Sequence, residues 1–148
     1  MKKLILLTIL IATFGTVAPA QRGRPAPFTG PVADLVNGIV NAINKQDMAY
    51  IQKVVAADAM WADGDIHVLP ASFFIGRLLQ GNPPKKLVIT NLVGQTWDNG
   101  AWAAFNYTLD EGTSQMKGIN TMTFKKVGND WQVILIHAAL DGTAIAPH

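Results

Sequence analysis

Two long, apolar-rich segments near the C-terminus constrain the fold most strongly. Met116–Val127 and Trp131–Leu140 are separated by Gly128-Asn129-Asp130, a spacing and composition typical of a β-hairpin. Side chains alternate between the two faces of a strand. The second segment is therefore expected to place on one face Trp131, Val133, Leu135, His137 and Ala139. Both faces are mostly apolar, so this hairpin needs cover on both sides.

The first twenty residues have the features of a secretory signal peptide. Lys2 and Lys3 precede the apolar run Leu4–Val17, and Ala18-Pro19-Ala20 is a small-residue signal for cleavage after Ala20. The apolar run is short for a membrane-spanning helix, and the chain has no cysteine to carry a lipid anchor. We therefore expect a secreted or periplasmic protein that has no membrane contact after cleavage.

The remaining sequence, 21–148, suffices for one domain with a sizeable core. The chain has 12 basic and 10 acidic residues, and cleavage of the signal peptide removes Lys2 and Lys3. The mature chain is therefore expected to have equal numbers of basic and acidic residues. A neutral surface argues against nucleic acid or acidic lipid as a partner. The lack of cysteine excludes disulfides, thiol nucleophiles and thiolate metal sites.

The other elements follow from hydrophobic periodicity and turn residues. We expect a flexible leader over 21–30, a domain over 31–140 and a loose tail over 141–148. The domain is expected to contain helices over 31–44, 47–57 and 70–80 and strands over 58–63, 66–68, 87–97 and 101–109, before the C-terminal hairpin. The turn Asn99-Gly100 is expected to pair Trp97 with Trp102. The pattern predicts an α+β fold with helices on one face of a strongly curved antiparallel sheet.

Several segments in this order resemble the NTF2-like superfamily. Asn44-Lys45-Gln46-Asp47 resembles the Asn-x-Gly-Asp joint between its first two helices, with Gln46 in place of glycine. Residues 58–63 (Asp-Ala-Met-Trp-Ala-Asp) resemble its Asp-Ala-x-x-x-Asp first strand. The spacing Phe124-x-x-x-Gly128-x-x-Trp131-x-Val133-x-x-x-His137 resembles the last hairpin of its SnoaL-like and DUF4440 branches. The match covers about Val32–Leu140.

The resemblance implies a cone-shaped α+β barrel that encloses a pocket and dimerises through the outer face of its sheet. We therefore expect a homodimer. Within this superfamily, the proton-shuttling Asp of the ketosteroid isomerase type aligns with Asp63. Its protonated Asp falls on Asn120 and its first-helix Tyr on Ile39. The base is thus kept, while the groups that stabilise an oxyanion are replaced by an amide and an apolar side chain.

Asp63 and His137 are the candidate catalytic residues. In an apolar cone Asp63 would suit a general base, whereas before Gly64 it could equally be a turn residue bonded to nearby backbone amides. His137 is expected to face the cavity if Trp131 and Val133 face the helices; the alternative is a core histidine bonded to a carbonyl. His67 would complete a cluster with Asp63 and His137. No close-spaced metal motif, phosphate loop or dinucleotide fingerprint is present, so we expect neither metal nor cofactor.

The candidate ligand-binding residues are aromatic walls and mid-strand amides. The walls are Trp61, Phe73 and Phe74, which alternatively belong to an ordinary core. Asn106 and Asn120 are costly to bury without partners, which favours a place in a pocket. The leading hypothesis is a binding protein for a small, mostly apolar molecule. One alternative is a cofactor-free isomerase or dehydratase in which Asp63 is the base and His137 or Asn120 polarises the carbonyl oxygen. The other is a protein-interaction module acting through its sheet face.

Overall fold

The computed structural model describes residues 26–64, 68–82 and 84–141. The expected signal peptide, His67 and the tail beyond Asp141 lie outside these residues, as do Asp65 and Ile66 of the expected short strand. No helix among the described residues is long and apolar enough to cross a membrane.

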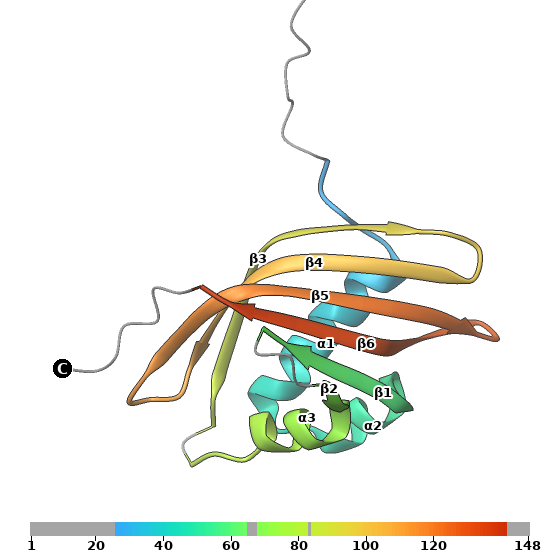
Figure 1. Ribbon diagram of the computed structural model, residues 1–148. Helices are drawn as coiled ribbons and strands as arrows, with labels where there is room; N and C mark the ends of the chain where they lie inside the picture. The colour runs from blue at the N-terminus through green and yellow to red at the C-terminus, as the bar shows by residue number, and fades with distance from the viewer. Residues whose placement is uncertain (1–25, 65–67, 83, 142–148) are drawn as a thin grey trace, which may run out of the picture.

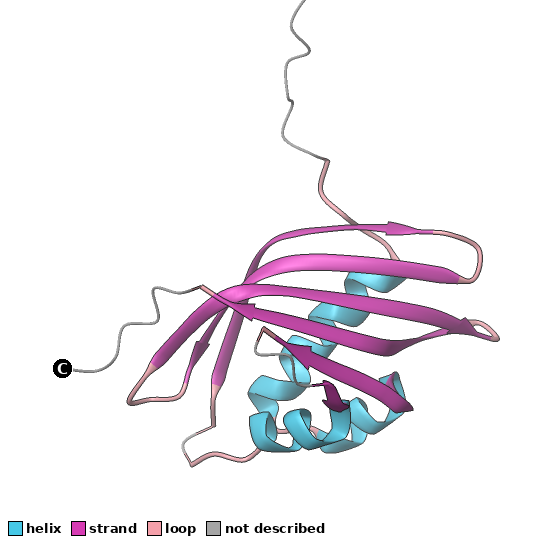
Figure 2. Ribbon diagram, viewed as in Figure 1, coloured by secondary structure: helices cyan, strands magenta, loops and turns pink. Residues whose placement is uncertain are grey.

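The architecture is α+β, as the sequence predicts. Three helices pack on one face of a six-stranded curved sheet (Figures 1 and 2). The helices are α1 (Pro31–Lys45), α2 (Met48–Val54) and α3 (Ala71–Leu79). The strands are β1 (Val55–Asp63), β2 (Val68–Pro70), β3 (Lys86–Thr96), β4 (Gly100–Asp110), β5 (Gln115–Val127) and β6 (Asp130–Leu140).

The sheet order is β2-β1-β6-β5-β4-β3, and all pairs are antiparallel except β1 with β6. The parallel pairing places β1 between the short edge strand β2 and the C-terminal strand β6. β1 begins at Val55, three residues earlier than expected, because α2 ends at Val54. The concave face of the sheet and the helices share one core, whose largest fully buried side chains include Ile39, Phe124 and Ile136.

α1 lies across the concave face because its apolar stripe is buried there (Figure 1). Two contacts fix its C-terminal end. The Asn44 side chain accepts a hydrogen bond from the Leu87 N–H at 2.6 Å and donates one to the Leu87 carbonyl at 2.9 Å. Gln46 ends the helix at φ 56°, the left-handed conformation that glycine adopts most easily. This explains why glycine is usual at this position in the NTF2-like pattern.

A bulge in β6 changes which side chains face inward. Thr123 pairs with Leu135 but the next residue, Phe124, pairs with Val133, so Ile134 is an extra residue in the strand. The alternation shifts by one residue after this point. Val133 and Ile136 are both buried, whereas Leu135 and His137 are exposed.

Two local expectations were wrong. The β3–β4 turn has Asp98-Asn99 at its centre, because the Trp97 N–H bonds to the Gly100 carbonyl at 2.8 Å; Trp102 therefore pairs with Gln95 and not with Trp97. The expected flexible leader is also anchored at Phe28. A Cβ on Gly94 would lie 2.7 Å from the Phe28 ring, so the ring packs directly on the Gly94 backbone. Both differences arise from contacts that turn composition does not reveal.

Candidate functional site

A cavity of about 500 Å³ lies between the concave face of the sheet and helices α1 and α3. Its walls are mainly apolar. Ile39 and Ile43 come from α1, and Phe105, Met122 and Ile136 come from the central strands. A volume of this size is typical of pockets for small organic ligands.

Asp63 and Asn120 stand in one row across the cavity wall. Asp63 pairs with Ala138 of β6, and Ala138 pairs in turn with Asn120 of β5. All three residues line the cavity. Their strands are two steps apart, which places the Asp63 and Asn120 backbones about 10 Å from each other. The small Ala138 side chain between them leaves space for a bound molecule. Trp61, two residues before Asp63 on β1, lines the cavity as well.

Asn120 is the buried polar residue of this wall. It is 6% exposed, and its Oδ1 atom has no hydrogen-bond partner within the part of the chain that the structure describes. An unsatisfied buried amide oxygen costs about 1–3 kcal/mol. Such a group in an otherwise apolar cavity is therefore a candidate contact for a ligand.

Tyr107 adds a hydroxyl group beside Asn120. It pairs with Gly118 of β5, and a Cβ on Gly118 would lie 2.9 Å from the Tyr107 hydroxyl oxygen. The ring thus lies directly over the Gly118 backbone, where any larger residue would displace it. Burial raises the pKa of Tyr107 above its usual value, because the phenolate is less well solvated in the cavity wall. The hydroxyl therefore stays neutral and able to donate a hydrogen bond.

Trp61 and Phe74 form the aromatic wall. Their ring centroids are 5.0 Å apart with an interplanar angle of 19°, a stacked pair contributed by β1 and α3. Phe73 was expected in this wall, but it is 56% exposed and contacts Phe74 edge-on from outside, at 5.5 Å. Phe73 lies with Ser72 on the exposed side of α3, whereas Phe74 and Ile75 line the cavity.

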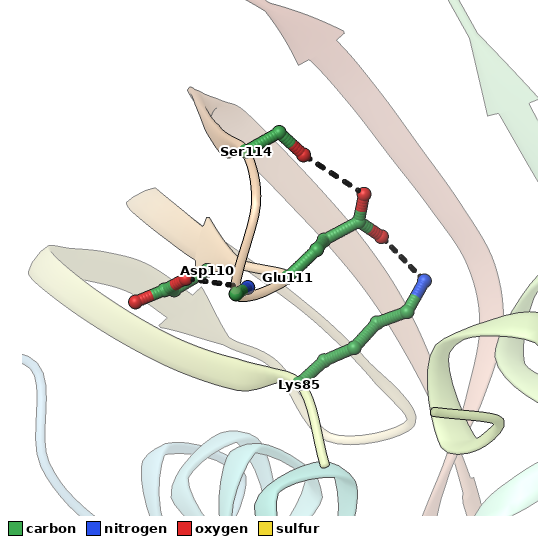
Figure 3. Close-up of polar contacts among 5 residues, drawn as sticks. Lys85, Asp110, Glu111 and Ser114 are labelled. Atoms are coloured by element: carbon green, nitrogen blue, oxygen red, sulfur yellow. Dashed lines mark hydrogen bonds and ion pairs between the residues drawn. The ribbon is translucent and has the colours of Figure 1, made fainter. Parts of the chain in front are cut away.

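Charged residues surround the open end of the cavity. Lys85, which precedes β3, forms an ion pair with Glu111, which follows β4 (Figure 3). The other carboxylate oxygen of Glu111 accepts a hydrogen bond from the Ser114 hydroxyl at 3.4 Å. A bond from the Gly112 N–H to Asp110 at 2.8 Å shapes the same turn. Arg77 of α3 also lines the cavity.

The predicted inward facing of His137 is wrong. His137 is exposed and pairs with Ala62 and Thr121 on the outer face, because the bulge at Ile134 reverses the alternation. Asn106 is likewise exposed on the outer face, where it pairs with Ile119. His67 lies outside the described residues. Asp63 lines the cavity and His137 lies on the outer face, so these two members of the expected cluster are not together. Within the described residues no three side chains are grouped to hold a metal ion.

Sequence reasoning missed the charged end of the cavity and the role of Tyr107 in its wall. Tyr107 lies two residues after Phe105 on the same strand, and this spacing would have placed it inward. Lys85 and Glu111 lie 26 positions apart, and only the pairing of β3 with β4 brings them together. No pattern in either segment alone indicates this pair.

No model of a known protein family matches this chain, and no curated protein matches it. Solved structures do. An NTF2-like protein from Cytophaga hutchinsonii superposes with a TM-score of 0.63 at 13% identity, over 74% of this chain and 95% of the other. The chain has the NTF2-like fold.

Other structures with this fold differ in their described roles. A Shewanella frigidimarina protein, provisionally named a ketosteroid isomerase, has a TM-score of 0.64 at 11% identity, over 74% of this chain and 94% of that one. The hub of CaMKII from S. rosetta has a TM-score of 0.64 at 12% identity, over 79% of this chain and 99% of that one. At these identities the NTF2-like fold is common to all of them, and function must be argued from the site.

Proposed function

We propose that this NTF2-like protein, of the SnoaL/DUF4440 type, binds a small, mostly apolar molecule in its cavity. The observation that carries the proposal is the buried amide of Asn120, which lacks a partner for its oxygen in a wall that is otherwise apolar. A ligand gains from burial of its apolar surface and from polar contacts with Asn120, Tyr107 and Asp63. The stacked pair Trp61–Phe74 forms one side of the binding space.

The test is native mass spectrometry of residues 21–148 purified gently from the host. We expect a discrete additional mass on the wild-type protein. Ala138→Phe should abolish it, because the new ring fills the space between Asp63 and Asn120. Ala57→Phe is the matched control, since Ala57 is exposed on β1 and does not line the cavity. A wild-type protein that carries no additional mass and takes up no neutral apolar dye would contradict the proposal.

A cofactor-free enzyme is the second candidate, and the row of Asp63 and Asn120 favours it. Asp63 would abstract a proton α to a carbonyl, and the Asn120 amide and Tyr107 hydroxyl would donate hydrogen bonds to the oxyanion that forms. This arrangement does not use His137, which lies on the opposite face. The test is proton–deuterium exchange at the α carbon of a bound ketone. Asp63→Asn should abolish exchange and preserve binding; equal exchange rates in both proteins would exclude Asp63 as the base.

We further propose that the outer sheet face contacts a second copy of the chain. Ile119, Val88 and Leu135 are 55%, 45% and 38% exposed there, and Trp102 is half-buried on the same face. Burial of such a surface against itself favours a two-fold dimer. Analytical ultracentrifugation should show a dimer that Ile119→Lys converts to a monomer. A wild-type monomer would exclude the homodimer and favour another protein as the occupant.

We also propose that the protein is exported, on the grounds of the basic start, apolar run and cleavage signal in residues 1–20. Fractionation of host cells should find the mature chain, with Gln21 first, outside the cytoplasm. Ala18→Asp should prevent the cleavage, because the signal requires small residues. A full-length protein in the cytoplasm would refute export.

A further inference from the structure

We propose that the ligand is an elongated amphipathic carboxylic acid whose carboxylate binds Lys85 at the open end of the cavity. This inference rests on the proposed binding function and specifies its ligand class. Lys85 and Glu111 both line the cavity, and their side chains are 20% and 27% exposed. Asn120, in contrast, is enclosed. The cavity therefore runs from an amide at its inner part to an ion pair at its opening.

Glu111 occupies the position on Lys85 that a ligand carboxylate would take. Its carboxylate is held by the Lys85 ammonium group and by the Ser114 hydroxyl, in a short turn between β4 and β5 (Figure 3). Exchange of one carboxylate for another conserves the charge pairing at Lys85. The Glu111 side chain, already partly exposed in the turn, regains water contact when it is displaced. Glu111 is thus an internal competitor of the ligand.

Four charged side chains line the cavity, the cations Lys85 and Arg77 and the anions Glu111 and Asp63. Asp63 lies in the row of Asn120, at the inner part of the cavity. Lys85 and Glu111 neutralise each other. Arg77 lines the same cavity, and none of the carboxylates in the described residues forms an ion pair with it. A ligand carboxylate that displaces Glu111 binds Lys85, and Arg77 is a second cationic side chain in the wall of the same cavity. Charge-assisted hydrogen bonds from lysine and arginine are the strongest that a carboxylate makes in proteins.

The distance between the two polar regions determines the shape of the ligand. Asn120 pairs with Phe105, and Glu111 lies six positions after Phe105, just beyond the end of β4. This is about 20 Å of extended chain, measured along the strand. The walls between are apolar and include Leu109, Met116 and Leu87. A molecule that contacts both regions is therefore elongated, with an apolar body and a charged head.

The test compares dodecanoate with dodecanol as competitors of a bound neutral dye, N-phenylnaphthylamine, at neutral pH. Without a cationic contact the charged head would lower affinity, because it is better hydrated than the alcohol. We expect dodecanoate to bind the wild-type protein about tenfold more tightly than dodecanol. Lys85→Met should remove this preference and leave dodecanol binding unchanged. Glu111→Gln should strengthen dodecanoate binding several-fold, because the competitor is lost.

Lys86→Met is the matched control, because Lys86 is exposed, pairs with Asp110 and does not line the cavity. It should retain the wild-type preference. Equal binding of dodecanoate and dodecanol to the wild-type protein would overturn this inference and leave the proposed function standing. Failure of the dye and of both competitors to bind would overturn both. If Lys85→Met does not fold, weaker dodecanoate binding by Glu111→Gln would still refute the role of Glu111.

Discussion

The two faces of β5 and β6 have similar side chains and opposite surroundings. On the inner face Met122, Phe124 and Ile136 are all at least 95% buried beneath the helices. On the outer face Ile119 and Leu135 are 55% and 38% exposed. Hydrophobicity therefore does not determine which face a residue occupies in this sheet. The cover provided by α1 and α3, together with the strand register, determines it.

The comparison is sharpest within β6, where two neighbouring residues fall on opposite faces. Ile136→Ala should lower the free energy of unfolding by about 2–5 kcal/mol, since it removes buried atoms and leaves a cavity. Leu135→Ala should lower it by about 1 kcal/mol or less. Urea denaturation at a concentration where the chain is monomeric measures both. The reverse order would show that the bulge at Ile134 is absent.

Gly118 tests how closely the inner face is packed. A Cβ there would lie 2.1 Å from the Ala139 carbonyl oxygen, so Gly118→Ala should destabilise the protein by about 1–3 kcal/mol. Gly76→Ala is the control, because Gly76 lies in α3 with no atom within 4 Å of the added Cβ. That substitution should stabilise the protein by about 0.5–1 kcal/mol. Equal effects in thermal unfolding would contradict the close packing at Gly118.

Asn120 and Asn106 lie on opposite faces of the sheet, so the effect of one substitution can be compared at both positions. Asn120→Leu should stabilise the ligand-free protein by about 1 kcal/mol, because it removes an unsatisfied buried amide oxygen. Asn106→Leu, on the exposed outer face, should change the stability by about 0.5 kcal/mol or less. Denaturant titration measures both. A strong loss of stability in Asn120→Leu would mean that its amide is already hydrogen-bonded.

The smallest expected effect concerns the ionisation of Tyr107 on the inner face. Burial raises its pKa above the usual value near 10, so the folded protein keeps its proton where the unfolded chain loses it. The stability that the retained Tyr107 proton contributes is fully present below pH 10 and is lost as the pH rises through the folded-state pKa. Tyr107→Phe should therefore weaken the decline of stability above pH 10. Burial also raises the pKa of Tyr50, so the part of the stability decline that Tyr50 causes should remain in this variant. An unchanged decline in Tyr107→Phe would contradict the burial.

Much of the fold followed from local patterns. Helix α1, the start of α2 and the four long strands were expected close to where they occur. The pairing of β1 with β6 was not expected, because a parallel contact between the first and last strands has no local signal. In the structure Asp63, Trp61 and Phe74 line the cavity. His137 does not, since one inserted residue reverses every side chain beyond it.

The sequence by itself determined the class of fold, the order of its elements and the presence of polar residues among apolar strands, because periodicity and turn chemistry are local properties of a chain. Only the tertiary structure decided which of those polar residues meet. The bulge turned His137 outward, and strand register aligned Asp63 with Asn120 across Ala138. The pairing of β3 with β4 brought Lys85 to Glu111. Each depends on register between distant segments, which is set by the packing of the whole sheet against its helices.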